Sequence, residues 1–318
     1  MILNAGNILL IGSILLFVSI VVGKAGFRFG VPALLLFLGV GMLFGTDGLG
    51  IEFNNPQTAQ FIGVIALSII LFSGGMDTSA AEIKPVLGQG IVLATVGVMF
   101  TAFLTGYFIY YITNLENSFV TLNFTESLLL ASVMSSTDSA SVFSILRSKR
   151  QGLKENLRPM LELESGSNDP MAYMLTILLI GIIQSGENSL SNTILQFIMQ
   201  MSIGAVSGYL LGRLAVYCIN KLNINQSLYP VLLLAFVFFI FSFTDLVKGN
   251  GYLAVYLAGL VVGNHKVVHK KSLTTFFDGI TWLFQIVMFL TLGLLVNPAE
   301  LLPVAALSIL IGVFMIIL

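Results

Sequence analysis

Two aspartates lie deep inside apolar stretches of this sequence, where a charged side chain is unfavourable without a partner or a function. Asp138 is about twelve residues into one apolar run, and Asp169 is about eleven residues into the next. At ~1.5 Å of helix per residue, both carboxylates would lie ~17 Å from a membrane face and so near the midplane. An ionised carboxylate at that depth costs several kcal/mol, which makes each aspartate a candidate functional residue.

Small and polar residues surround both aspartates. Asp138 belongs to the run Ser135-Ser136-Thr137-Asp138-Ser139, whose side chains compete with the helix for backbone hydrogen bonds. Asp169 ends the run Glu164-Ser165-Gly166-Ser167-Asn168-Asp169 and precedes Pro170, which has no N–H to donate to the carbonyl of Gly166. We therefore predict two broken helices at the midplane, an arrangement from which many secondary transporters build an ion site.

The side chains in these runs define the chemistry of the predicted site. Hydroxyl, carbonyl and carboxylate oxygens are hard ligands that suit Na⁺ or K⁺. A carboxylate removed from water favours its protonated form, so it can hold either a proton or a cation. Competition for one carboxylate is sufficient for exchange if the site faces one side of the membrane at a time. Asp138 and Asp169 are therefore the predicted Na⁺ or K⁺ ligands of a cation/proton antiporter, and no cofactor is expected.

The elements that must position these acids are membrane-spanning helices. Of 318 residues, 57% are hydrophobic and 9% are charged, whereas a soluble domain has about 25% charged residues. Most of the surface must therefore face lipid. We predict an all-α polytopic membrane protein of about eleven transmembrane helices. Its apolar runs lie near 7–23, 31–45, 59–73, 86–112, 126–147, 158–184, 193–220, 228–245, 250–264, 275–296 and 302–318, and those at 31–45, 59–73 and 250–264 are short for a span.

The basic residues predict the orientation of these helices. Alternate loops and helix ends, beginning with the first loop, hold 13 of the 14 Lys and Arg residues, and the opposite set holds Lys248. Because Lys and Arg stay on the cytoplasmic side, we predict an N-terminus outside. The first run lacks the basic residues that precede a signal peptide's apolar segment and is read as a permanent helix. The sequence stops within an apolar run at Leu318, so we expect more helices to follow.

Glycines recur at every fourth position on two predicted helices. Gly204, Gly208 and Gly212 do so on the seventh, and Gly41 and Gly45 on the second. Small residues at this spacing let helices approach closely. The contact could lie within the chain or between two copies in a dimer.

The motifs around the acids resemble those of the cation:proton antiporter family of the NhaP type. Thr137-Asp138 on one helix and Asn168-Asp169 on the next carry this resemblance. The runs Val142-Phe143-Ser144-Ile145-Leu146-Arg147 and Met288-Phe289-Leu290-Thr291-Leu292-Gly293-Leu294-Leu295-Val296 resemble the bacterial potassium/proton branch of that family. The resemblance covers most of residues 1–318.

The resemblance implies roles for individual residues. Asp169 would be the carboxylate that alternates between cation and proton, and Asp138, Ser165 and the main chain at Thr137 would complete the cation site. Glu164 would form a structural ion pair with an arginine on a late helix. Asn168 stands where electrogenic relatives have a second aspartate, which implies electroneutral, one-for-one exchange.

The resemblance also implies an organisation for the chain. The fold would consist of two inverted repeats, the first about 1–184 and the second, incomplete, about 228–318, with a linking helix at about 193–220. A core would move against a dimerisation domain within a homodimer in the lipid of the bacterial inner membrane, and no nucleic acid partner is expected. The family's closest members have thirteen helices, and the second broken helix with its arginine would lie beyond Leu318.

Other interpretations of the acids remain open at this stage. Glu162 and Glu164, nearer the cytoplasmic face, could pair with basic side chains and hold the helices together, and the two aspartates could do the same. A cation channel or another ion-coupled transporter could use the same oxygen ligands. An intramembrane aspartyl protease also has two aspartates on neighbouring helices, but it carries Tyr-Asp and Gly-x-Gly-Asp, whereas here Thr137 and Asn168 precede the aspartates.

Overall fold

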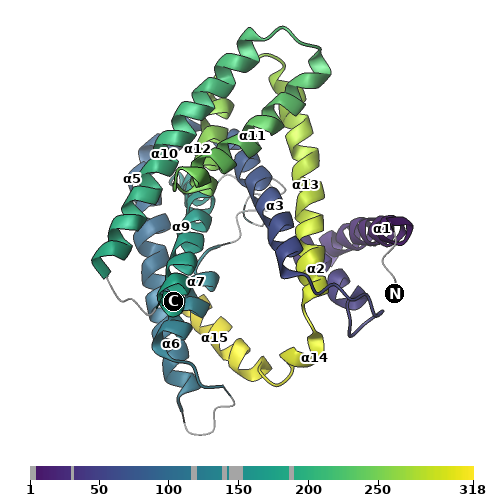
Figure 1. Cartoon of the computed structure of the whole chain (residues 1–318), viewed down its shortest axis with the longest axis vertical. Coiled ribbons are helices and arrows are strands. Elements are labelled where there is room, and N and C mark those ends of the chain that lie inside the picture. Colours follow the sequence, from purple (N-terminus) through teal and green to yellow (C-terminus); the bar gives the residue numbers. More distant parts are fainter. Residues whose placement is uncertain (1–4, 30–31, 116–119, 138–141, 143–152, 186–189) are drawn as a thin grey trace. The chain divides into compact units, whose positions relative to one another are not determined.

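A computed structural model describes residues 5–29, 32–115, 120–137, 142, 153–185 and 190–318 (Figure 1). Over these ranges the regular elements are helices. Their bounds are Ala5–Phe29 (α1), Ala33–Phe44 (α2), Pro56–Asp77 (α3), Ala80–Ile83 (α4), Leu87–Val92 (α5), Val98–Thr113 (α6), Phe124–Met134 (α7), Leu157–Ser185 (α9), Leu190–Lys221 (α10), Tyr229–Leu246 (α11), Gly251–Asn264 (α12), Lys270–Leu295 (α13), Pro298–Leu301 (α14) and Ala305–Ile317 (α15).

The helices confirm the predicted multi-pass membrane fold. In the described part of the chain, 6 helices are long and apolar enough to cross a membrane, and shorter apolar helices of 10–17 residues account for the other predicted runs. The third run is longer than predicted, because α3 has 22 residues and includes polar residues at its start. The fourth span is α4 to α6, joined by a 3₁₀ turn at Lys84–Val86 and a π-helical turn at Leu93–Gly97.

Capping side chains explain where several helices begin. Asn55 Oδ1 accepts a hydrogen bond from the backbone N–H of Thr58 at 3.0 Å, directly before Pro56 opens α3. At the start of α7, Asn123 and Glu126 accept bonds from each other's backbone N–H groups, at 2.9 and 2.8 Å. These side chains satisfy N–H groups that have no partner within the helix.

The two predicted breaks have different outcomes. The helix α7 ends at Met134, and residues 135–137 are not helical, as predicted. In contrast, α9 is one helix that runs through Pro170, so the predicted break there is absent. A membrane helix can carry a proline when neighbouring helices support the affected turn, and α12 contacts that turn of α9, as shown below.

The chain divides into two compact units. The first contains residues 1–70 and 276–305, and the second contains residues 71–275 and 306–318. Within the first unit, Gly41 of α2 meets α13 backbone to backbone. A Cβ added to Gly41 would lie 2.5 Å from the carbonyl oxygen of Leu290 and 2.8 Å from the Cα of Gly293.

In the second unit the repeated glycines of α10 pack against α12. A Cβ on Gly204 would lie 2.7 Å from the carbonyl oxygen of Asn250, and a Cβ on Gly208 would lie 2.5 Å from that of Ala254. Gly212 meets the next turn of α12 in the same way. Of the two predicted roles for this repeat, packing within the chain is therefore confirmed.

The helix α12 also packs closely against the last turns of α3. A Cβ on Gly259 would lie 2.2 Å from the carbonyl oxygen of Phe72, and one on Gly263 would lie 2.1 Å from that of Met76. Nine of the 14 residues of α12 are buried. This short helix is therefore enclosed by its neighbours in the second unit.

We expect Gly208→Ala to lower the thermal unfolding midpoint of the purified protein, because its methyl group would overlap the carbonyl of Ala254. Overpacking of this kind destabilises by about 1–3 kcal/mol. Gly181→Ala on α9 is the matched control, since a Cβ there meets nothing within 4 Å. In the control, the better helix propensity of alanine should stabilise by about 1 kcal/mol. An equal or higher midpoint for Gly208→Ala would contradict the close packing of α10 on α12.

Candidate functional site

A cluster of oxygen-bearing side chains joins the end of α7 to the middle of α9, and we call it the α7–α9 cluster. The helix α7 ends beside it, where the hydroxyl of Ser135 donates to the carbonyl of Ser132 at 2.8 Å. The chain then leaves helical geometry over residues 135–137 and passes alongside α9. The members of the cluster are Ser136, Thr137, Glu164, Ser165, Asn168 and Asp169.

Ser136 holds the carboxylate of Asp169 against this non-helical segment. Its hydroxyl donates to Asp169 Oδ1, and it also lies 3.1 Å from Asn168 Oδ1. Ser136 belongs to the polar run around Asp138, but no role in the site was predicted for it. The spacing of residues could not have revealed this role, because a side chain in a non-helical segment has no direction fixed by helical periodicity.

Asn168 organises the other half of the cluster. Its side chain is fully buried, and its amide nitrogen donates to Thr137 Oγ1 at 2.6 Å and to Glu164 Oε1 at 2.8 Å. A buried amide that uses both of its protons on named partners is fixed in one orientation. Asn168 therefore connects the α7 end, through Thr137, to the carboxylate of Glu164 one turn earlier on α9.

Hydroxyl groups complete the surroundings of Glu164. Its Oε2 atom lies 3.4 Å from the hydroxyls of Thr137 and Ser165, and these two hydroxyls are 3.1 Å apart. Among the residues that the structure describes, no basic side chain forms an ion pair with Glu164. Glu162, by contrast, accepts a bond from Arg158 Nε at 2.9 Å, an ion pair within α9 that joins no second helix.

The cluster has the chemical composition of a monovalent cation site. It offers carboxylate, amide and hydroxyl oxygens from two chain segments, all of them hard ligands. Thr137 is exposed, and Asp169 and Glu164 are half-buried. The structure thus brings together every predicted site residue except Asp138, which lies outside the described residues.

Further contacts fix α7 and α12 to α9 near the cluster. The hydroxyls of Ser132 and Thr176 lie 3.0 Å apart and join α7 to α9. Asn250, the residue that caps α12, donates from its amide to the carbonyl of Pro170 at 3.1 Å. No role in the site was predicted for Asn250. Its partner is 80 residues away, so no local pattern signals this contact.

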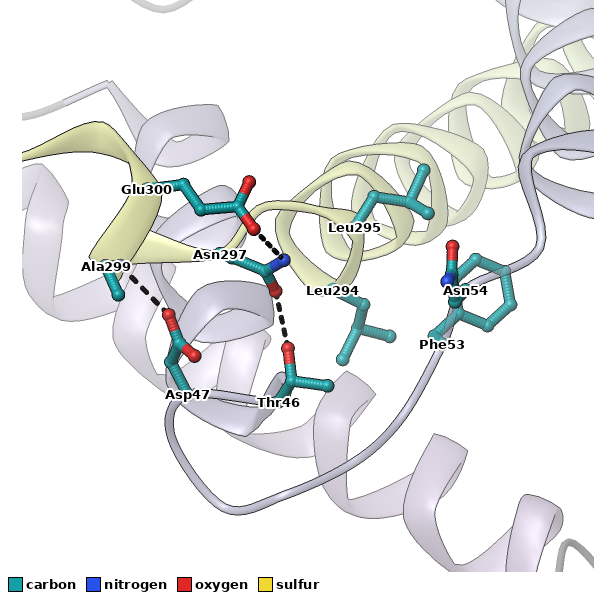
Figure 2. Close-up of a pocket in the computed structure, with 9 residues that line it drawn as sticks. All are labelled: Thr46, Asp47, Phe53, Asn54, Leu294, Leu295, Asn297, Ala299 and Glu300. Atoms are coloured by element: carbon teal, nitrogen blue, oxygen red, sulfur yellow. Dashed lines mark hydrogen bonds between the residues drawn. The ribbon is translucent and has the colours of Figure 1, made fainter. Parts of the chain in front are cut away.

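A polar pocket of about 280 Å³ lies in the first unit (Figure 2). Thr46 donates to Asn297 Oδ1 at 2.5 Å, and Asn297 donates in turn to Glu300 Oε1 at 3.1 Å. Asp47 Oδ2 accepts a bond from the N–H of Ala299 at 2.9 Å. These bonds tie the loop after α2 to the start of α14. We assign the pocket a structural role, because each of its carboxylates already has a partner.

A family model described as "Sodium/hydrogen exchanger, transmembrane" matches residues 12–318 of the chain. The chain is 43% identical over 297 residues to the K(+)/H(+) antiporter NhaP of Alkalimonas amylolytica, covering 93% of this chain and 50% of the relative. It is 38% identical over 304 residues to the K(+)/H(+) antiporter NhaP2 of Shewanella sp. (strain ANA-3), covering 95% of this chain and 51% of the relative. The chain thus spans about half the length of these curated relatives.

The fold is similar to that of a solved antiporter. The structure of the sodium proton antiporter MjNhaP1 from Methanocaldococcus jannaschii at pH 8 superposes with a TM-score of 0.81. The match covers 96% of this chain and 74% of that one, at 21% sequence identity. This similarity confirms the antiporter fold predicted from the sequence.

We expect Asn168→Asp to lower the thermal unfolding midpoint at neutral pH. The change removes the donor to Glu164 and places a second carboxylate beside it in a buried position, which should destabilise by about 2 kcal/mol or more. The exposed Asn225→Asp is the control, with an expected change within about 0.5 kcal/mol. A midpoint for Asn168→Asp equal to that of the control would refute the bond to Glu164.

Proposed function

The chain belongs to the sodium/hydrogen exchanger family, and we propose that the full-length protein exchanges a monovalent cation for a proton across the membrane. The observation that carries this proposal is the carboxylate of Asp169, bonded to Ser136 at the non-helical end of α7 within an apolar span. K⁺ is the favoured cation, because two relatives that match most of the chain are named K(+)/H(+) antiporters. Na⁺ is the alternative.

The proposed mechanism is competition for Asp169. When the carboxylate is ionised, it binds the cation together with oxygens from Asp138, Ser165 and the main chain at Thr137. When it is protonated, the charge is lost and the cation leaves. Each transit then carries either one cation or one proton. Asn168 is neutral and adds no second titrating group at this position, so we infer electroneutral exchange.

We further infer the organisation of the full-length protein. Residues of about 1–184 and 228–318 would form a first and an incomplete second inverted repeat, joined by the linking helix at about 193–220. The protein would be a homodimer in the bacterial inner membrane, with its N-terminus outside. The distribution of Lys and Arg supports this orientation.

The central prediction is that Asp169→Asn abolishes exchange, because an amide cannot alternate between a proton and a cation. Everted vesicles that contain the full-length protein and hold an acid-inside pH gradient would receive K⁺ or Na⁺, while a pH-sensitive dye reports the gradient. The exposed Asp245→Asn, at the end of α11, is the matched control and should retain exchange. Wild-type exchange by Asp169→Asn would exclude Asp169 as the exchanging carboxylate. A cation flux that continues without a proton counter-flux would indicate a channel instead.

The orientation is testable with single cysteines in a Cys218→Ser background. A membrane-impermeant maleimide applied to intact cells should label Glu52→Cys, which is exposed in the loop after α2. It should label Lys266→Cys, in the loop after α12, only after the cells are permeabilised. The reverse labelling pattern would show that the N-terminus is inside.

A further inference from the structure

The turn of α9 that carries Asn168 and Asp169 is weakened by its sequence. Pro170 has no N–H, so the carbonyl of Gly166 lacks its helical hydrogen bond. Gly166 itself adds backbone freedom at the same turn. The helix nevertheless continues through this turn from Leu157 to Ser185. Some neighbour must therefore restrain the turn, and the contacts identify that neighbour as α12.

Before the proline, the ring of Tyr256 lies directly against Gly166. A Cβ added to Gly166 would lie 2.3 Å from Tyr256 Cε2 and 2.7 Å from Cζ. Tyr256 is fully buried, so its ring has little freedom to move away. The backbone of α9 is thereby supported at the residue whose carbonyl lacks its helical partner.

At the proline itself, Asn250 supplies a second support. Its amide donates to the carbonyl of Pro170 at 3.1 Å, and the side chain is only 4% exposed. Two other bonds fix Asn250 in place: its Oδ1 accepts from the N–H of Leu253 at 3.0 Å, and its backbone N–H donates to the carbonyl of Gln200 at 2.9 Å. A donor held by α10 and α12 therefore restrains the residue that follows Asp169.

A third contact lies one turn further along α9. The rings of Tyr173 and Tyr252 meet edge to face, with centroids 4.9 Å apart and an interplanar angle of 82°. Contacts from α12 therefore occur before, at and beyond the weakened turn. They come from Asn250, which caps α12, and from residues 252 and 256 in its first two turns.

We propose that α12 stabilises this turn of α9, and that Asn250 is a positioning residue that fixes Asp169 relative to the hydroxyl of Ser136. Without the bond from Asn250, the turn between Gly166 and Pro170 bends more freely, and the oxygens of the α7–α9 cluster are less well ordered for a cation. The effect on exchange rests on the proposed function. The effect on the backbone of α9 does not.

Asn250→Ser separates the two roles of this side chain. Serine is a good helix cap, so the bond to Leu253 can be kept, but its shorter side chain cannot reach the carbonyl of Pro170. We expect the cation concentration for half-maximal exchange to rise about three- to tenfold, the effect of one lost hydrogen bond. The maximal rate should change less, and the thermal unfolding midpoint should stay near that of wild type. Asn123→Ser makes the same change at the cap of α7 and should leave the half-maximal concentration unaltered.

The proline provides a test of the cause. In a Pro170→Ala background the missing N–H is restored and can donate to the carbonyl of Gly166, so the turn depends less on the contacts from α12. Asn250→Ser should then raise the half-maximal cation concentration by less than it does beside Pro170, a coupling that a double-mutant cycle measures. An equal effect in both backgrounds would overturn the proposal that α12 stabilises this turn. An unchanged half-maximal concentration for Asn250→Ser beside Pro170 would also overturn it.

Amide hydrogen exchange tests the stabilisation of this turn by α12 independently of transport. Exchange over residues 164–172 should be faster in Asn250→Ser than in wild type, and unchanged in Asn123→Ser. If wild type exchanges no cation for protons, the proposed function fails, and amide exchange alone then tests whether α12 stabilises this turn. Equal amide exchange in wild type and Asn250→Ser would refute it. If Asn250→Ser does not fold, Tyr256→Leu, which removes the ring at Gly166, tests the same prediction.

Discussion

The close approach of α12 to its neighbours is the constraint on which the second unit depends. Glycines on α10 meet its backbone from one side, and its own Gly259 and Gly263 meet the backbone of α3. In lipid there is little hydrophobic force between helices, so association relies on close packing and on hydrogen bonds. Glycine permits this packing because a Cβ at these contacts would lie within about 3 Å of backbone atoms. The position of α12 then determines which of its residues reach α9.

The polar cluster follows from a second requirement, that buried polar groups find partners. Asn168 is fully buried and gives its amide protons to Thr137 and Glu164, while Ser136 donates to Asp169. These bonds cross between α9 and a non-helical segment, so they stabilise backbone that would otherwise be unfavourable at membrane depth. The arrangement leaves carboxylate and hydroxyl oxygens oriented by neighbours, as a site for a small hard cation needs.

The same features relate rigidity to the proposed exchange. A carboxylate that alternates between a proton and a cation must keep its other ligands in place while its own charge changes. Pro170 weakens the turn that carries Asp169, and the contacts from Asn250 and Tyr256 offset that weakness. The site thus combines a helix turn without the N–H of residue 170 with restraint from a neighbouring helix.

The sequence by itself determined the class of the fold, the apolar runs and the two polar runs on neighbouring segments. These properties depend on local hydrophobicity and on residues close in the chain. The tertiary structure decided that α9 continues through Pro170, that Ser136 bonds to Asp169, and that Asn250 reaches the proline carbonyl. It also joined Thr46 to Asn297, 251 residues apart. Such contacts depend on how each helix is rotated and placed against its neighbours, and packing between distant segments sets that rotation.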